Sequence, residues 1–237
     1  MGKKAFVRDE KKARSEKSCP IRKIGEESEE DLVIVISDDE ENPAATPVLN
    51  MNDVDTLTGA EWLNDAVINY FGKAAVEGST IVFVESQLHQ ALDSRATEDK
   101  VSRHEATRRF LKVAERGDGM YVTPARVAGC HWVVICMDFA EGKTCCLDSY
   151  GTNFERAKKL MAELMEVELK SSVKEVKVAV PRQKNTWDCG VHAIRALMAV
   201  KERPQVMSDG VVEFDVEEIT PLRRRLQEQA MAVAQST

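Results

Sequence analysis

Hydrophobic and polar positions divide the chain near residue 48. Residues 3–23 hold nine basic and three acidic side chains, and residues 26–41 hold nine acidic and no basic ones. A segment so charged buries too little apolar surface to offset the entropy of folding, so residues 1–47 are expected to form a disordered tail. The remainder, residues 48–237, is expected to form one folded domain.

Beyond residue 48 the apolar positions follow first a helical period and later a strand period. Thr58 is a possible N-cap for the first helix, which would hold Trp62 and Leu63 among its apolar residues. Residues 81–84 suit either a short strand or a helix entry. The expected helices cover about 59–75, 85–92, 103–115, 155–170, 189–201 and 220–234, and the expected strands cover 132–139, 144–149 and 176–180. Helices in front, then strands, then helices predict an α+β domain.

Composition and charge narrow the class of protein. The formal net charge is −7, so a nucleic-acid partner is not expected. No apolar run approaches the about 18 residues of a membrane helix, and no apolar stretch follows the N-terminus, so neither a membrane protein nor a secreted one is expected. The six cysteines form no Cys-x-x-Cys pair, which argues against a zinc site. We therefore expect no metal, no cofactor, a location in the nucleus, the cytoplasm or both, and by default a monomer.

One cysteine stands where a nucleophile is favoured. The segment 181–190 joins a predicted strand to a predicted helix, and Cys189 falls at the helix start. Free backbone N–H groups and the helix dipole favour a thiolate there. Gly190 leaves space for a substrate backbone, and the amide of Gln183 can donate to an oxyanion. The alternative is a buried, inert helix cysteine, and position alone does not separate the two interpretations.

A cysteine nucleophile needs a base within hydrogen-bond reach, and His131 is the first candidate. It opens the strand that begins with Trp132, while Asp148 closes the neighbouring strand, so both would share the open end of one hairpin. A turn at 141–143 would place Asp148 opposite residue 135, about 13 Å from His131 at about 3.3 Å per residue. The pairing would then need a twist or a bulge in the strands.

Three further histidines are weaker candidates for the base. His192 lies three residues after Cys189 on the same predicted helix, but no carboxylate is placed to orient it. We interpret it as a helix-face residue that packs under the site. His89 and His104 lie in charged, helical stretches and are expected to be solvated.

Four short motifs occur together in one order along the chain. They are Trp62-Leu63-Asn64-Asp65, then His131-Trp132, then Leu147-Asp148-Ser149, and finally Gln183 six residues before Cys189 within Asp188-Cys189-Gly190. This ordered set resembles the sentrin/SUMO-specific proteases, the Ulp family, from about Thr58 to the C-terminal helix. The resemblance implies a papain-like α+β fold in which helices flank a small central mixed β-sheet.

The resemblance also implies an activity. It assigns a catalytic triad to His131, Asp148 and Cys189 and assigns Gln183 to the oxyanion hole. The expected reaction is cleavage after the C-terminal Gly-Gly of SUMO, which removes SUMO from lysine isopeptides or matures its precursor, so SUMO and its conjugates are the expected partners. The alternatives are a protease for another ubiquitin-like modifier, an acyl transferase on a related scaffold, and a non-catalytic SUMO-binding adaptor.

Substrate-binding residues follow from the same resemblance. Trp62 and Trp132 would close a narrow channel over the Gly-Gly tail, which suits a tail without side chains because two aromatic rings can clamp its bare backbone. From the sequence pattern alone, both tryptophans would be core residues. Asp65 would contact the modifier, although it equally suits an ordinary acid on a helix surface.

The N-terminal tail contains one apolar segment. Val33, Ile34, Val35 and Ile36 stand directly before an acidic block within residues 32–41. The pattern resembles a SUMO-interacting motif, which adds a strand to a sheet edge while its acids meet basic residues beside that edge. The alternative is an edge strand of the folded domain, or a sticky segment guarded by charges.

Overall fold

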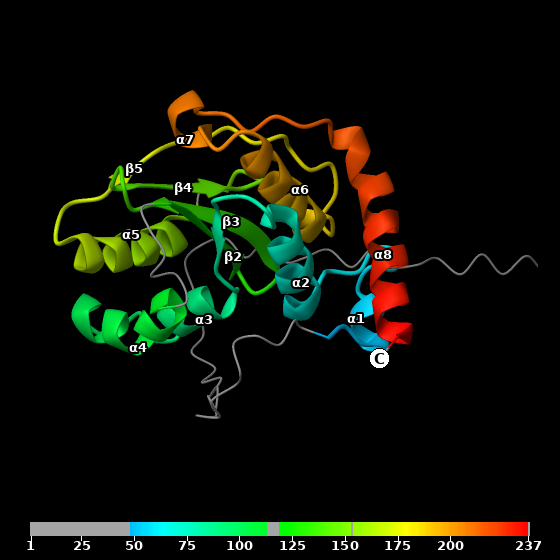
Figure 1. Ribbon diagram of the computed structural model, residues 1–237, viewed down its shortest axis with the longest axis horizontal. Coiled ribbons are helices and arrows are strands. Elements are labelled where there is room, and N and C mark those ends of the chain that lie inside the picture. The colour runs from blue at the N-terminus through cyan, green and yellow to red at the C-terminus, as the bar shows by residue number, and fades with distance from the viewer. Residues whose placement is uncertain (1–47, 113–118, 153, 237) are drawn as a thin grey trace, which may run out of the picture. The chain divides into compact units, whose positions relative to one another are not determined.

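The computed structural model describes residues 48–112, 119–152 and 154–236 (Figure 1). The predicted tail, residues 1–47, and its apolar segment at 32–41 lie outside the described residues. Within the described ranges, no helix is both long enough and apolar enough to cross a membrane.

A mixed five-stranded sheet forms the centre of the domain, in the order β1-β2-β3-β4-β5. The three central strands pair antiparallel, whereas the short edge strands β1 and β5 run parallel to β2 and β4. The strands are β1 (Val82–Phe83), β2 (Met120–Val127), β3 (His131–Asp138), β4 (Lys143–Leu147) and β5 (Lys174–Glu175). The small mixed sheet predicted from the resemblance is confirmed.

Helices cover both faces of the sheet (Figure 1). One face lies under α2 and α6, the other under α3 and α5, and α8 packs on α1 and α6. The helices are α1 (Met51–Asp55), α2 (Asp65–Val76), α3 (Gln87–Asp93), α4 (Lys100–Lys112), α5 (Glu155–Leu169), α6 (Cys189–Glu202), α7 (Val206–Asp209), the 3₁₀ turn η1 (Val216–Glu218) and α8 (Ile219–Gln235).

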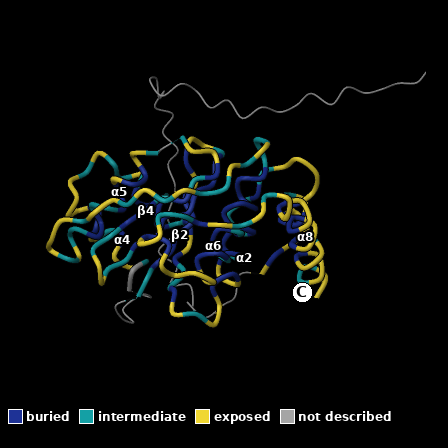
Figure 2. Tube along the Cα trace, turned by 90° about the horizontal axis from the view of Figure 1, so that it is seen from above, coloured by how far each residue is buried: buried dark blue, intermediate teal, exposed yellow. Residues whose placement is uncertain are grey.

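All residues of the central strand β3 except the last are buried. Buried residues gather in the middle of the domain and exposed ones along its outer segments (Figure 2). Because side chains alternate along a strand, the residues of β3 divide between two cores. The core beneath α2 and α6 receives Trp132, Val134 and Cys136, and the core beneath α3 and α5 receives Val133, Ile135 and Met137. Burial on both sides explains why the run from 132 onward reads as continuously apolar. It also fixes the position of the strand whose first residue is His131.

The first predicted helix, 59–75, is wrong at its start. α2 begins only at residue 65 because Asn64 is its N-cap, and the Asn64 side-chain oxygen accepts from the Val67 N–H at 3.0 Å. Trp62 and Leu63 therefore lie in a non-helical segment ahead of α2. Their side chains and carbonyl groups are free to make contacts across the domain.

The strand predictions also change. The hydrophobic pattern does not predict β2, because Pro124 and polar residues interrupt it. The strand predicted at 176–180 is displaced, since β5 ends at residue 175 and Ala179 forms only an isolated bridge to Val211. β2 forms a hairpin with the neighbouring β3, whereas the bridge at Ala179 depends on a segment about 30 residues away. The remaining predicted helices agree with α3, α4, α5, α6 and α8 within a few residues.

Candidate active site

The β3–β4 hairpin brings His131 and Asp148 together. Because Leu147 pairs with Val134, Asp148 is offset from His131 by only two residues along the hairpin. The expected separation of about 13 Å is therefore wrong, since the turn occupies residues 139–142 and shifts the register of β4. His131 Nε2 lies 2.8 Å from Asp148 Oδ1.

The Asp148 carboxylate is held by the turn that follows β4. Its Oδ1 accepts from the Tyr150 N–H at 2.8 Å, and its Oδ2 accepts from the Thr152 N–H at 2.7 Å. Burial alone would raise the pKa of Asp148. The hydrogen bonds from His131 and from the backbone outweigh burial and lower this pKa to about 2. The carboxylate is therefore ionised at neutral pH and fixed beside the imidazole.

The Cys189 thiol also lies close enough to His131 to act on the pKa of the imidazole. Since Nε2 faces Asp148, Nδ1 is the ring nitrogen left for the sulfur. Burial lowers the pKa of His131, whereas the hydrogen bond to Asp148, the neighbouring Cys189 thiol and the charges of both raise it to about 9. The rings of Tyr150 and Phe154 flank the imidazole, with centroids 5.8 and 5.3 Å away. An imidazolium held in this way can balance a thiolate at neutral pH.

Cys189 is the first residue of α6, as the sequence predicts, and only 1% of it is exposed. Its Sγ lies 3.8 Å from the carbonyl oxygen of Cys130, the residue before His131. A Cβ added at Gly190 would lie 2.9 Å from the Leu63 side chain. Leu63 therefore fills the space beside Gly190 that the sequence suggested was left for substrate, and the glycine lets the segment before α2 close on the start of α6.

Gln183 is fixed by the same turn that holds Asp148. Its backbone N–H donates to the Ser149 carbonyl at 3.0 Å, and its Oε1 accepts from the Ser149 hydroxyl at 2.7 Å. Its Nε2 donates to the Asn185 carbonyl at 2.6 Å. A side-chain amide nitrogen carries two donors, so this one bond does not exhaust it. Sequence reasoning gave Ser149 no role, and its place directly after Asp148 is the only signal that could have found it.

Both tryptophans bind the segment ahead of α2 to the site. Trp132 is 1% exposed, and its Nε1 donates to the Leu63 carbonyl at 2.8 Å. Trp62 is half-buried, and its Nε1 donates to the Thr186 carbonyl at 2.8 Å in the loop before Cys189. Trp132 is thus a core side chain here, and of the two only Trp62 presents a surface. Their action as channel walls stays a prediction.

Asp65 lies at the first position of α2 and is partly exposed. It accepts a hydrogen bond from Gln90 Nε2, and its Oδ1 lies 3.9 Å from Arg126 Nη1. The carboxylate therefore sits among polar neighbours at the protein surface. Contact with a modifier stays a prediction.

The other three histidines are all buried. His192 is 3% exposed, its ring packs 5.8 Å from the ring of Phe214, and burial lowers its pKa to about 4. A histidine of this kind stays neutral and makes a poor partner for a thiolate. His89 and His104 are 3% and 9% exposed, so the expectation that they are solvated is wrong. His104 Nε2 lies 2.6 Å from Glu168 Oε1, between α4 and α5.

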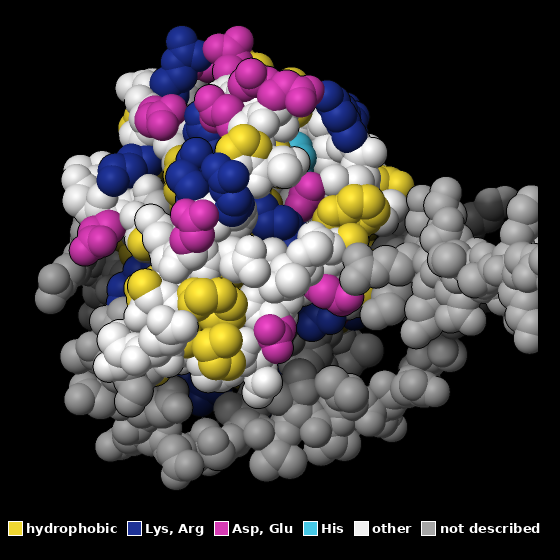
Figure 3. Space-filling view, turned by 90° about the vertical axis from the view of Figure 1, so that its right-hand side faces the viewer, with side chains coloured by type: hydrophobic (Ala, Val, Ile, Leu, Met, Phe, Trp, Pro, Cys, Tyr) yellow, Lys and Arg dark blue, Asp and Glu magenta, His cyan; other side chains and the backbone are white. Residues whose placement is uncertain are grey.

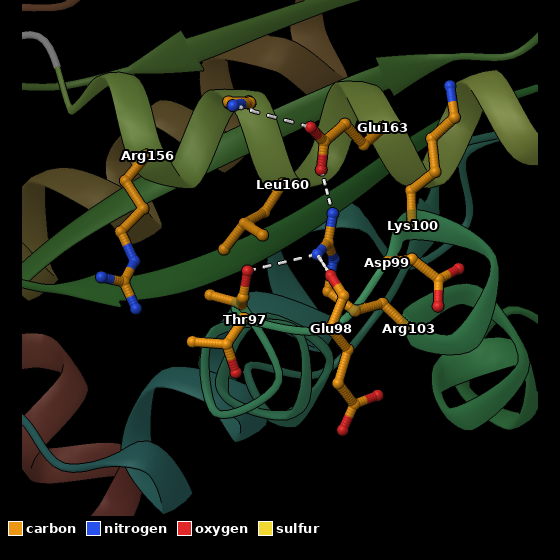
Figure 4. Close-up of a pocket in the computed structure, with 10 residues that line it drawn as sticks. Thr97, Glu98, Asp99, Lys100, Arg103, Arg156, Leu160 and Glu163 are labelled. Carbon is orange, nitrogen blue, oxygen red and sulfur yellow. Dashed lines mark hydrogen bonds and ion pairs between the residues drawn. The ribbon is translucent and has the colours of Figure 1, made fainter.

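A hollow of about 520 Å³ lies between the start of α4 and α5 (Figure 4). Arg103 crosses it and donates to the Ala96 carbonyl and to the Glu163 carboxylate. Neither His131 nor Cys189 lines this hollow. The hollow is therefore separate from the site built around Cys189.

Comparison with known families decides where the chain belongs. Residues 61–231 match the model of the Ulp1 protease family, C-terminal catalytic domain. The chain belongs to the Ulp1 protease family. The resemblance drawn from the four ordered motifs is thereby confirmed, and the matched stretch contains His131, Asp148, Gln183 and Cys189.

The curated relatives of this chain have low sequence identity to it and are much longer than it is. Sentrin-specific protease 5 of Mus musculus is 25% identical over 192 residues, which cover 76% of this chain and 24% of the relative. The protein of the same name from Homo sapiens is also 25% identical over 192 residues, covering 76% of this chain and 23% of the relative. The chain thus spans about a quarter of the length of these relatives.

Solved Ulp1-family domains share the fold. The C-terminal Ulp1 protease domain in complex with Smt3, the yeast ortholog of SUMO, superposes with a TM-score of 0.63 at 19% identity, covering 79% of this chain and 87% of that one. The Ulp1-like SUMO protease catalytic domain of Chaetomium thermophilum gives 0.58 at 22% identity, covering 81% and 83%. The papain-like fold of Ulp1 catalytic domains, expected from the sequence, is confirmed.

Proposed function

We propose that this Ulp1-family chain is a cysteine protease that cleaves after the C-terminal Gly-Gly of SUMO, with Cys189 as its nucleophile. The observation that carries the proposal is the position of His131, which is hydrogen-bonded to Asp148 on one side and lies next to the Cys189 thiol on the other. A base held between an orienting carboxylate and a thiol is the arrangement that nucleophilic catalysis by cysteine requires.

The reaction follows from this arrangement. The Cys189 thiolate attacks the carbonyl carbon of the terminal glycine, and Gln183 Nε2 with the Cys189 backbone N–H donates to the oxyanion. His131, oriented by Asp148, gives its proton to the departing amine, which is a lysine side chain in a conjugate or the next residue in a precursor. A water molecule, deprotonated by His131, then hydrolyses the thioester. Every protein group used in these steps belongs to this chain.

Substrate choice is assigned to the segment ahead of α2. Trp62 keeps an exposed surface beside the loop that precedes Cys189, and a Gly-Gly backbone is slender enough to pass against it. Trp132, whose Nε1 donates to the Leu63 carbonyl, would support the same path from the core side. Asp65 supplies a charged contact for the body of SUMO at the same end of α2.

The segment at 32–41 gives a second, weaker contact with SUMO. Four aliphatic residues next to a run of acids suit strand addition to a sheet edge. We place the protease domain at residues 48–237, as a monomer in the nucleus, the cytoplasm or both. A protease for another ubiquitin-like modifier would use the same triad and differ only in its docking surface.

A covalent trap tests the proposal directly. The full chain is incubated with SUMO that carries a C-terminal vinyl group, beside ubiquitin with the same trap, and adducts are resolved by mass. We expect an adduct with SUMO and none with ubiquitin. The adduct should disappear in Cys189→Ala and persist in Cys146→Ala, which removes a different thiol on β4.

Other outcomes assign the chain differently. An adduct with ubiquitin or another modifier alone would keep Cys189 as nucleophile and overturn the choice of SUMO. A folded protein that forms no adduct, yet binds untrapped SUMO, would be an adaptor rather than a protease.

A further inference from the structure

A buried arginine on the last helix reaches the residue before the nucleophile. Arg223 is 7% exposed, and its Nε donates to Asp188 Oδ1 at 2.7 Å. Its Nη1 donates to the Thr56 carbonyl at 3.3 Å, and its Nη2 donates to the carbonyls of Glu61 and Trp187 at 3.0 and 3.1 Å. Four of the five guanidinium donors are therefore used within the domain.

The rest of α8 behaves as an ordinary surface helix. Its outer face carries basic and acidic side chains next to one another (Figure 3). The next residue, Arg224, has a side chain that is 76% exposed and lies 3.8 Å from Glu228. Arg223 thus differs from its neighbour in position and partners, although both side chains carry the same charge.

The partner of Arg223 stands at the N-cap of α6 but does not cap it. Aspartate is among the strongest N-cap residues, because its carboxylate accepts from the first free N–H groups of a helix. Asp188 makes no such bond. Its Oδ1 faces Arg223, and its Oδ2 accepts from Asn185 Nδ2 at 2.7 Å. At α2, by contrast, the Asn64 side chain does cap the helix.

This orientation matters because Cys189 is the first residue of α6. A carboxylate turned toward the helix start would occupy the N–H groups that stabilise a thiolate or an oxyanion, and would add a negative charge beside the sulfur. His131 interacts with Cys189 and Asp148, and the buried His192 interacts with Asp188 and His131. Together with Arg223, these are the charged and titratable groups that the packed elements bring to this place. Of these, Arg223 is the group that pairs with Asp188 by a salt bridge.

We propose that Arg223 is a positioning residue for the nucleophile: it holds the Asp188 carboxylate away from the start of α6 and neutralises it, so that the helix N–H groups stay available to Cys189. The inference rests on the proposed protease function, in which the Cys189 thiol is the nucleophile. The contacts that support it can be tested on the thiol alone, without a substrate. The same guanidinium also fixes the carbonyl of Glu61, directly before Trp62. It therefore couples the loop before the nucleophile to the segment that would receive substrate.

The test is the pH dependence of Cys189 alkylation in the full chain. Iodoacetamide is added between pH 4 and 10, and modification of the Cys189 peptide is followed by mass spectrometry, so that SUMO is not needed. In Arg223→Met the unpaired Asp188 charge should move the midpoint of the profile to higher pH by about one unit. At pH values below both midpoints the alkylation rate should then fall about tenfold.

Three further variants make the sign of the effect decisive. Asp188→Asn leaves the guanidinium charge without a compensating negative charge, so its midpoint should move to lower pH. The double variant Arg223→Met with Asp188→Asn removes both charges and should return to within about 0.3 unit of the wild-type midpoint. Arg224→Met removes the same charge from the same helix at an exposed position, so its profile should match that of the wild type.

A purely structural role for Arg223 predicts a different result. Arg223→Met would then lower the melting temperature and leave the alkylation midpoint unchanged, which would overturn the proposal. If Arg223→Met does not fold, the variants Arg223→Lys and Asp188→Asn test the proposal. Arg223→Lys keeps the positive charge and should keep the wild-type alkylation midpoint. An unchanged midpoint in Asp188→Asn would contradict the proposal. If the variants shift the alkylation midpoint as expected but the chain does not cleave SUMO, the proposed function is refuted and this inference still holds.

Discussion

The two sides of the site each place an aspartate next to a proposed catalytic residue, and they orient its carboxylate in opposite ways. At the open end of the β3–β4 hairpin, Asp148 faces His131 and is held there by backbone N–H groups. At the start of α6, Asp188 adjoins Cys189 in the chain, but its carboxylate faces Arg223 instead. One negative charge is presented to the reaction, and the other is kept from it.

The difference follows from what each reacting group needs. An imidazole that must carry a positive charge gains from a nearby carboxylate, and burial of the pair strengthens the interaction. A thiol that must lose its proton is hindered by the same charge, and gains from the helix N–H groups instead. The hairpin side therefore supplies negative charge, and the helix side removes it.

The largest expected effect comes from exchanging Asp148 for asparagine, and the same exchange at Asp188 is its comparison. Asp148→Asn removes the charge that favours the imidazolium and presents an amide to His131, so kcat for SUMO cleavage should fall about 10³- to 10⁴-fold. Asp188→Asn keeps an oxygen for Arg223 and removes a charge that does not face the reaction, so the loss should stay below about tenfold. Steady-state kinetics on a SUMO precursor measures both. Equal losses would mean that the two carboxylates do the same work and that the comparison is wrong.

A smaller effect separates the two buried histidines, one on each side. The pKa of His131 is raised to about 9 above its usual 6.5, so its contribution to stability is complete below pH 6.5 and is lost as the pH rises through 9. The pKa of His192 is lowered to about 4, so its contribution is present above pH 6.5 and is lost as the pH falls through 4. Asp148, with a pKa lowered to about 2, loses its own contribution between about pH 4 and 2.

Urea unfolding between pH 4 and 10 measures this contrast. The difference in free energy of unfolding between wild type and His131→Gln should shrink above pH 7. The difference between wild type and His192→Gln should shrink below pH 6. If both differences changed in the same direction with pH, the opposite environments that we assign to the two histidines would be refuted.

The sequence anticipated the parts of the site that depend on local pattern. The strand at His131 follows from a continuous apolar run, the β3–β4 hairpin from the turn residues after it, and the helix at Cys189 from its position after a polar loop. The ordered motifs added the pairing of His131, Asp148 and Cys189, which no local pattern could supply. The predicted register of β4 against β3 was wrong by two residues. A turn of four residues gives no stronger sequence signal than a turn of three.

What the sequence missed depends on contacts between distant segments. The start of α2 is set by the cap at Asn64, whose Nδ2 also donates to Asp53 at 2.8 Å, and Trp62 is held by a loop 124 residues away. Asp188 and Arg223 are 35 residues apart, and each alone reads as an ordinary charged residue. Charges that are paired and buried cannot be told from solvated ones by composition.

The smallest expected effect extends the comparison to the oxyanion side of the hairpin. Ser149 follows Asp148 directly, and its hydroxyl donates to Gln183 Oε1 at 2.7 Å, which turns the Nε2 of that amide toward the loop before Cys189. Ser149→Ala should therefore lower kcat about three- to tenfold and leave KM nearly unchanged, because removing an oxyanion donor outright costs about 10² to 10³. Ser149→Ala should cost nothing further in a Gln183→Ala background, since the amide that it orients is then absent. Ser94→Ala, at the end of α3, controls for the loss of a hydroxyl elsewhere. Additive losses in the double variant would show that Ser149 acts on something other than Gln183, and the hairpin would then position the base alone.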